Sequence, residues 1–174
     1  DRVIALFRYN GAPSDSTIVA ALDRNTGAVL WRFAMGGAYP ASAPVVLSDR
    51  VFVVSLAHDV VALSLTTGAK LWQADASDGS GGIVMDGITA CDGRVIVPTG
   101  SGRVRALNAE SGAVLWNSEN VKLGSNMMLQ CLHGTVLAYI GDLRILRASD
   151  GTRLASYPLR PFAAFIEGAT REAS

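Results

Sequence analysis

The residues best suited to chemistry in this chain of 174 residues are two histidines and one acidic loop. His58 and Asp59 are adjacent, as in half of an acid/base pair, but they fall between two predicted strands with no nucleophile placed near them, which favours a solvated turn. The segment from Asp75 to Gly82 is acidic and glycine-rich, as calcium loops are. It departs from the EF-hand spacing and no Glu closes it, so we predict a connecting loop. With two His and no clustered ligands, the sequence gives no support to a catalytic zinc site.

The composition is that of a globular, turn-rich chain. Hydrophobic residues make up 49% and charged residues 17%, with 18 Gly and 6 Pro, which argues against disorder. Fifteen basic and fifteen acidic residues cancel, so nucleic acid is not an expected partner. The longest apolar runs are strand-sized, so we expect no membrane span. The chain begins at Asp1 without Met or a signal-like segment, and we expect it to be either processed or an excised piece.

The strongest pattern is one phrase that occurs three times and then decays. It reads ALDRNTGAVLW at 21–31, ALSLTTGAKLW at 62–72, ALNAESGAVLW at 106–116 and, in weaker form, ILRASDGTRLA at 145–155. A period of about 40 residues in strand-forming sequence indicates an array of one supersecondary unit, most often the blades of a β-propeller.

Four units can be laid out as meanders of short strands. The first has strands at 2–8, 18–23 and 28–33, and the second at 44–47, 51–56, 60–65 and 69–74. The third has strands at 88–91, 94–98, 103–108 and 113–117, and the fourth at 127–132, 135–140, 143–148 and 152–157. We predict an all-β propeller domain over residues 1–174 with about four four-stranded blades, a partial ring or half of an eight-bladed ring. The blades lie at roughly 1–35, 42–76, 85–118 and 125–160.

The first unit lacks its first strand, and the apolar segment 161–166 is a candidate replacement within the tail 161–174. If it pairs beside residues 2–8, it closes a small ring and removes the exposed strand edges. The alternative is that it completes a blade in a neighbouring chain or in a longer protein.

Each position of the phrase has a structural role. The polar residue caps backbone N–H groups of the turn, the glycine supplies a positive φ, and the tryptophan bridges adjacent blades with its indole N–H on a backbone carbonyl. The predicted docking motif consists of Ala21, Asp23, Gly27 and Trp31, then Ala62, Ser64, Gly68 and Trp72, then Ala106, Asn108, Gly112 and Trp116.

This motif resembles the tryptophan-docking repeat of the quinoprotein (PQQ-like) propeller family, which runs Ala-x-Asp-x-x-x-Gly-x-x-x-Trp with Thr common before the Gly. The first copy matches in full, with Thr26 before its glycine. The second departs at Ser64 and the third at Asn108 and Ser111. The fourth keeps little beyond Gly151, with Arg147 at the polar position and Ala155 at the Trp position.

The resemblance implies two classes of function. The family's alcohol and sugar dehydrogenases are large rings that add a vicinal disulfide, a stacking Trp, calcium carboxylates and a catalytic Asp around PQQ. This chain has no adjacent cysteines, and its three Trp residues belong to the docking motif. The non-catalytic branch, which resembles outer-membrane assembly lipoproteins, carries the repeats without a cofactor.

We therefore predict a non-enzymatic scaffold for protein–protein interaction or complex assembly, without catalytic, cofactor or metal residues. The alternative is a fragment of a PQQ-dependent dehydrogenase whose catalytic residues lie outside this chain, with PQQ and calcium as cofactors. The expected partner is a protein or additional blades that complete the ring, with a homodimer as one form. The resemblance slightly favours an extracytoplasmic location.

Two further features concern the last two units. Cys91 and Cys131 are one repeat period apart, at near-equivalent positions for which direct approach is not implied. We predict buried free thiols, with a disulfide as the alternative. The arginines Arg144, Arg147 and Arg153 concentrate positive charge on the fourth unit, so we predict a partner surface there, although alternation on an outer strand explains them equally well.

Overall fold

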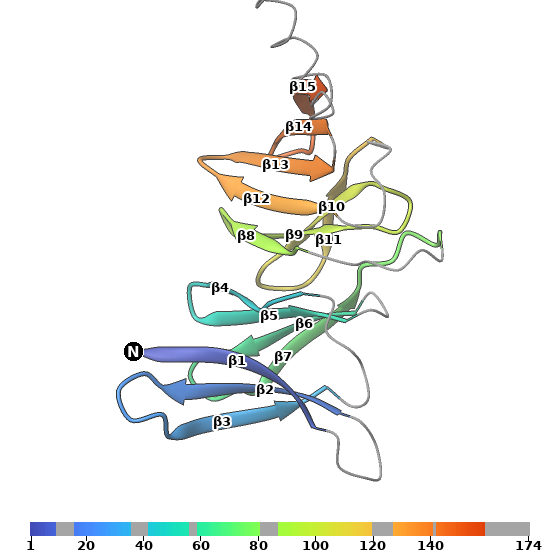
Figure 1. Ribbon diagram of the computed structural model, residues 1–174. Coiled ribbons are helices and arrows are strands. Elements are labelled where there is room, and N and C mark those ends of the chain that lie inside the picture. Colours follow the sequence, from blue (N-terminus) through green and yellow to red (C-terminus); the bar gives the residue numbers. More distant parts are fainter. Residues whose placement is uncertain are drawn as a thin grey trace, which may run out of the picture.

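The computed structural model describes residues 1–9, 16–35, 42–55, 59–80, 87–119, 127–140 and 142–158. In these ranges the regular structure is all β, with fifteen strands in four antiparallel sheets (Figure 1). Among these residues there is no helix that is long and apolar enough to cross a membrane.

Each sheet is a meander in which consecutive strands pair. Sheet 1 consists of β1 (Arg2–Tyr9), β2 (Ser16–Asp23) and β3 (Val29–Ala34). Sheet 2 consists of β4 (Val45–Leu47), β5 (Arg50–Val54), β6 (Asp59–Ser64) and β7 (Lys70–Asp75). Sheet 3 consists of β8 (Thr89–Cys91), β9 (Arg94–Pro98), β10 (Val104–Asn108) and β11 (Val114–Asn117). Sheet 4 consists of β12 (Met128–Leu132), β13 (Thr135–Ile140), β14 (Asp142–Arg147) and β15 (Arg153–Pro158).

The first hairpin of sheets 2, 3 and 4 closes with a two-residue turn. Ser48, Asp92 and His133 open these turns with φ values of 56°, 49° and 48°. Two-residue hairpins that match the twist of their strands need positive φ, and Ser, Asp and His are polar residues that adopt it at modest cost. His133 therefore has a structural role in a turn.

The four sheets stack face to face, with an apolar cluster in each of the three junctions (Figure 1). Strand β5 shows why its sequence lacks polar alternation. Val51 and Val53 pack into the junction with sheet 1, whereas Phe52 and Val54 pack into the junction with sheet 3. Because both faces of the strand are covered, every position from Val51 to Val54 is apolar.

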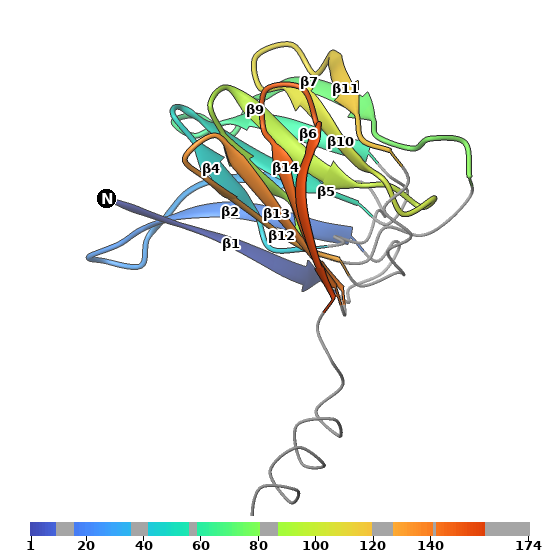
Figure 2. The same cartoon turned by 90° about the horizontal axis from the view of Figure 1, so that it is seen from above.

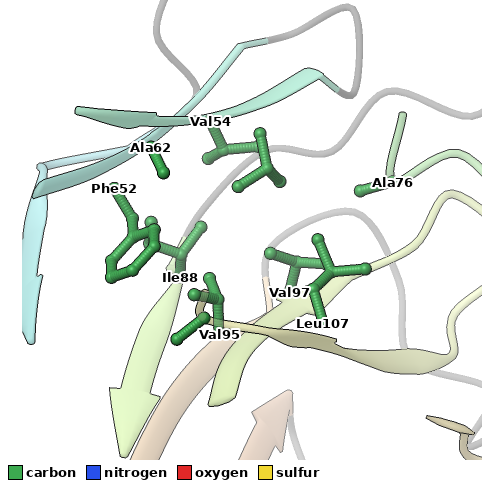
Figure 3. Close-up of a cluster of buried hydrophobic side chains, with 10 residues drawn as sticks. Phe52, Val54, Ala62, Ala76, Ile88, Val95, Val97 and Leu107 are labelled. Atoms are coloured by element: carbon green, nitrogen blue, oxygen red, sulfur yellow. The ribbon is translucent and has the colours of Figure 1, made fainter. Parts of the chain in front are cut away.

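The junction between sheets 2 and 3 is shown in Figure 3, where side chains of both sheets meet in one cluster. Along one edge of the stack, β4 lies beside β8 and β8 lies beside β12. Successive sheets are turned relative to one another, as the view from above shows (Figure 2). In a β-propeller the first strands of neighbouring blades lie close together and the sheets fan out from them, which is the arrangement seen here.

The structure confirms the predicted all-β propeller fold with four sheet units. In the described residues sheet 1 has three strands and β1 is an edge strand, as the sequence predicts. The predicted closing strand at 161–166 lies outside the described residues, so the closing strand and the blade limits stay predictions.

Candidate functional site: the tryptophan docking interface

The repeated phrase folds into a tight turn followed by a bulged strand. In the first copy, the Asp23 Oδ1 atom accepts hydrogen bonds from the backbone N–H groups of Asn25 at 2.9 Å and Thr26 at 2.8 Å. The backbone and side-chain hydrogen bonds from Thr26, followed by the one from Asn25, hold the pKa of Asp23 below its usual value. The polar residue thus caps the turn.

In the other two copies, the number of hydrogen bonds that the capping residue accepts differs with its side chain. The Asn108 Oδ1 atom accepts from two backbone N–H groups, those of Glu110 and Ser111, at 2.8 and 3.0 Å. The Ser64 hydroxyl accepts one, from Thr67 at 3.2 Å. A serine cap is therefore the weakest of the three, as its shorter side chain predicts.

The fourth turn keeps its shape although its sequence has decayed. Arg147 replaces the capping residue, and Asp150 takes over by accepting from the N–H of Thr152 at 2.9 Å and pairing with Arg147 at 3.1 Å. The backbone and side-chain hydrogen bonds from Thr152, with a smaller contribution from Arg147, lower the pKa of Asp150. Sequence reasoning missed this cap, although an Asp directly before the motif glycine is a readable signal.

Each tryptophan crosses to the next sheet and donates its indole N–H to a backbone carbonyl there. Trp31 bonds Leu65 at 2.9 Å, Trp72 bonds Ala109 at 3.1 Å, and Trp116 bonds Ala148 at 3.0 Å. Every acceptor is the residue directly after the polar position of the next copy. These acceptors were also missed, although that residue is apolar in copies two to four.

The motif glycine of the next sheet lies against the face of the same indole. A Cβ placed on Gly68 would come within 2.6 Å of two ring atoms of Trp31, and one on Gly112 would come within 2.8 Å of Trp72. On Gly151 it would come within 2.5 Å of Trp116. Real Cβ atoms do not approach that closely, so these positions require glycine for space as well as for φ.

The motif alanine stands directly opposite the tryptophan in its own sheet. Ala21 pairs with Trp31, and Ala62 and Ala106 stand in the same register opposite the other two. All three alanines are fully buried. In sheet 4 the large and small side chains exchange positions: Ile145 stands at the alanine position of the motif and pairs with Ala155, which stands at the tryptophan position. The small residue and the large one therefore form a complementary pair in every sheet.

The prediction that Cys91 and Cys131 are free thiols is wrong. They form a disulfide between β8 and β12, with their Cα atoms 6.0 Å apart. The physical reason is that equivalent positions on the first strands lie where neighbouring blades come closest. A Cα distance in that range suits a disulfide. The N–H of Cys131 also donates to the Thr89 hydroxyl at 3.2 Å, which ties the same two strands together.

The arginines predicted as a partner surface are each ion-paired within the chain. Arg144 pairs with Asp142 at 3.0 Å, and Arg147 pairs with Asp150. Arg153 reaches across to Glu119 of sheet 3 at 2.9 Å. Their charges are largely compensated, and the surface stays a prediction.

The carboxylate of Asp78, in the acidic loop after β7, accepts hydrogen bonds from groups of this chain. The Asp78 carboxylate accepts hydrogen bonds from the Ser101 hydroxyl and the Ser80 N–H. Partial burial acts to raise the pKa of Asp78, but hydrogen bonds from Ser101, Ser80 and Thr99 outweigh it and hold the pKa well below its usual value. Asp59 begins β6, and His58 lies outside the described residues.

A PQQ site of the kind that the resemblance describes needs adjacent cysteines, a stacking indole and clustered carboxylates. Here the two cysteines join different sheets, and each indole lies in a junction between sheets. Among the described residues, no three His, Cys, Asp or Glu side chains come together as metal ligands would. The described residues therefore do not fit such a site.

Comparison with known proteins places this geometry in a family. Residues 14–164 match the family of the outer membrane protein assembly factor BamB. The chain is 31% identical to BamB of Shewanella oneidensis over 103 residues, which are 59% of this chain and 26% of that protein. It is also 30% identical to a polyvinylalcohol dehydrogenase of Sphingopyxis sp., in a match that covers 59% of this chain and 19% of that protein.

The fold is also similar to a solved structure. BamB from Moraxella catarrhalis superposes with a TM-score of 0.66 at 19% identity, over 90% of this chain and 50% of that one. The chain thus spans half of that structure and smaller shares of both relatives. With its tryptophan-docking turns and stacked antiparallel sheets, the chain belongs to the outer membrane protein assembly factor BamB family of PQQ-like repeat propellers.

Proposed function

We propose that this chain is a non-enzymatic propeller scaffold that binds protein partners in complex assembly. The observation that carries the proposal is the outer face of sheet 4. Leu129 and Cys131 of β12 point into the junction with sheet 3, so their neighbours point away. Met128 is 66% exposed and Leu132 51% exposed.

The same face continues across the sheet. Tyr139 of β13 and Tyr157 of β15 both stand opposite Leu143, so the two rings share one side. They are about half exposed. Contiguous exposed apolar side chains with aromatic residues are typical of protein interaction surfaces. Family membership supports the same reading, since the Shewanella relative is named as an assembly factor.

A differential pull-down tests this. The wild-type chain is compared with Met128→Glu and Tyr157→Glu, and with Leu71→Glu as the matched control on an exposed leucine of sheet 2. We expect the control to recover the same partners in the same amounts, and each face variant to lose them by about tenfold, because a buried charge opposes docking. Equal recovery with all variants would contradict the proposal.

The second candidate is part of a PQQ-dependent dehydrogenase, and the similarity to the polyvinylalcohol dehydrogenase favours it. Added PQQ with calcium is expected to leave the melting temperature unchanged and to give no bound quinone absorbance if the scaffold proposal holds. A saturable thermal shift with bound quinone would instead support the dehydrogenase.

We also propose an extracytoplasmic location and a ring completed by further sheets. Disulfides persist in oxidising compartments, and Cys91 and Cys131 form one. Within the part of the chain that the structure describes, sheet 1 has one strand fewer than the other sheets, and a hollow of about 700 Å³ lies between it and sheet 2, lined by Ile4, Val46 and Leu65 among others. Additional blades or a protein partner would cover both end faces of the stack.

A further inference from the structure

The docking interface divides into a donor and a socket. The donor is the indole of one sheet. The socket is the motif glycine of the next sheet together with the carbonyl that accepts the indole N–H. Sheets 2, 3 and 4 each have a filled socket, at Gly68, Gly112 and Gly151, occupied by the tryptophan of the sheet before.

Sheet 1 carries a socket of the same shape. Its Gly27 has φ 73°, against 72° to 75° in the three filled sockets. The N–H of Gly27 bonds the carbonyl of Asp23 at 2.9 Å, and the filled sockets close their turns with the same bond at the same length. The N–H of Arg24 bonds the carbonyl of Asp1, as Leu65 bonds Asp49 in sheet 2. The socket is therefore formed without an occupant.

No tryptophan reaches this socket from the described residues. A Cβ on Gly27 would meet nothing within 4 Å. The carbonyl of Arg24, which is the position that accepts an indole elsewhere, has no hydrogen bond among the described groups. Arg24 differs from its apolar counterparts Leu65 and Ala109, so the rim of this socket carries a charge.

The face around the socket is apolar like the other end of the stack. Ile4 and Leu6 of β1 point toward sheet 2, so Val3 and Phe7 point away from it. Val3 is 47% exposed and Phe7 is 43% exposed. A formed socket on an exposed apolar face continues the pattern of the three internal junctions.

A second copy of this chain lacks the matching donor. Its free face is that of sheet 4, where Ala155 stands in the donor position opposite Ile145. Docked on sheet 1, that face would leave the Gly27 socket empty. On the basis of the proposed scaffold function, we infer that the partner covering sheet 1 is a PQQ-like blade with Trp four residues after its turn glycine, and not sheet 4 of a second copy.

Restoring the donor in this chain tests the inference. Ala155→Trp gives sheet 4 an indole, so that two copies can dock head to tail. We expect sedimentation equilibrium to show self-association at least about tenfold tighter than in the wild type, since burial of an indole with its hydrogen bond strongly favours binding. We also expect the fluorescence of the added tryptophan to shift to shorter wavelength on association.

A matched pair of glycine variants locates the contact. In the Ala155→Trp background, Gly27→Ala is expected to return association to the wild-type level, because its Cβ would fill the socket. Gly93→Ala is the control, since Gly93 has φ 71° and equally open space but lies in the first hairpin of sheet 3. If Ala155→Trp folds poorly, Ile145→Ala/Ala155→Trp recreates the alanine–tryptophan pair of the other sheets.

Two results would overturn the inference. One is a wild-type chain that already self-associates in a manner sensitive to Gly27→Ala, since a second copy would then cover sheet 1 without an indole. The other is association by Ala155→Trp that is no tighter than in the wild type or does not respond to Gly27→Ala. Neither result depends on whether the outer face of sheet 4 recovers partners in the pull-down. Failure of this inference can therefore be distinguished from failure of the scaffold proposal.

Discussion

The indole of Trp31 lies so close to Gly68 that a Cβ on the glycine would come within 2.6 Å of the Cδ2 and Cε3 ring atoms. The contact joins sheet 1 to sheet 2 at the outer edge of the stack, beside the hydrogen bond from the same indole to Leu65. One motif position is therefore under two separate constraints, a left-handed backbone and a lack of space for any side chain.

Comparison of Gly68→Ala with Gly27→Ala separates the two constraints. Both glycines have nearly the same φ, so both variants incur a backbone cost of about 1–2 kcal/mol. Only Gly68→Ala also displaces an indole, which adds about 1–3 kcal/mol as overpacking does. Urea unfolding is expected to show the larger loss for Gly68→Ala. Equal losses would mean that the indole moves aside freely.

The indole N–H and the indole ring are expected to contribute separately at Trp116. Trp116→Phe keeps a ring but leaves the carbonyl of Ala148 without its donor, at a cost of about 1–3 kcal/mol. Trp116→Ala removes the ring as well, at about 3–5 kcal/mol. Tyr157→Ala is the control, because that side chain is 54% exposed and its loss is expected to change the free energy of unfolding by less than about 0.5 kcal/mol. Equal losses for the two Trp116 variants would argue against a contribution from the ring.

Reduction is expected to weaken the chain through the bond between Cys91 and Cys131. The bond closes a loop with a sequence separation of 40, for which chain entropy gives about 4 kcal/mol. Thermal unfolding with and without dithiothreitol measures the effect. Cys91→Ser/Cys131→Ser should match the reduced wild type and show no response to reductant. A wild type whose melting temperature ignores the reductant would rule out this contribution.

The stability contributed by Asp78 is expected to depend on pH in a defined direction. Its pKa is lower in the folded chain than the usual value near 4, so the unfolded chain binds a proton first as pH falls. The contribution is therefore complete above about pH 4 and is lost as pH falls toward the folded pKa.

Urea unfolding of wild type and Asp78→Asn between pH 3 and pH 7 measures that contribution. The difference between the two proteins should stay constant above about pH 5 and shrink below about pH 4. Ser101→Ala removes one donor to the carboxylate and should reduce the pH dependence. A difference that grows on acidification would contradict the sign.

Much of the fold could be predicted because the signals that mark its turns and strand ends are local in the sequence. Tight turns such as the one opened by Ser48, and glycines such as Gly68, mark where strands end. The apolar run Val51 to Val54 shows that a strand is covered on both faces. These signals depend on neighbours in sequence, so they survive without knowledge of the tertiary structure.

The features that sequence reasoning missed depend on which surfaces meet. Cys91 and Cys131 pair because the first strands of sheets 3 and 4 converge, and a spacing of one period does not reveal that convergence. The four motif glycines look alike in sequence, yet Gly27 alone among them has no indole against it. That difference comes from the position of sheet 1 at the end of the stack. It is not caused by any residue in the turn of sheet 1.

The disulfide has a consequence for how the stack comes apart. In an array of this kind, stability is a sum over units and their nearest-neighbour contacts. Sheets 3 and 4 share a covalent bond as well as an indole contact, whereas the described contacts of sheet 1 with sheet 2 are non-covalent. Under a mechanical load we therefore expect sheets 3 and 4 to separate from each other last, after the non-covalent junctions on the side of sheet 1 have opened.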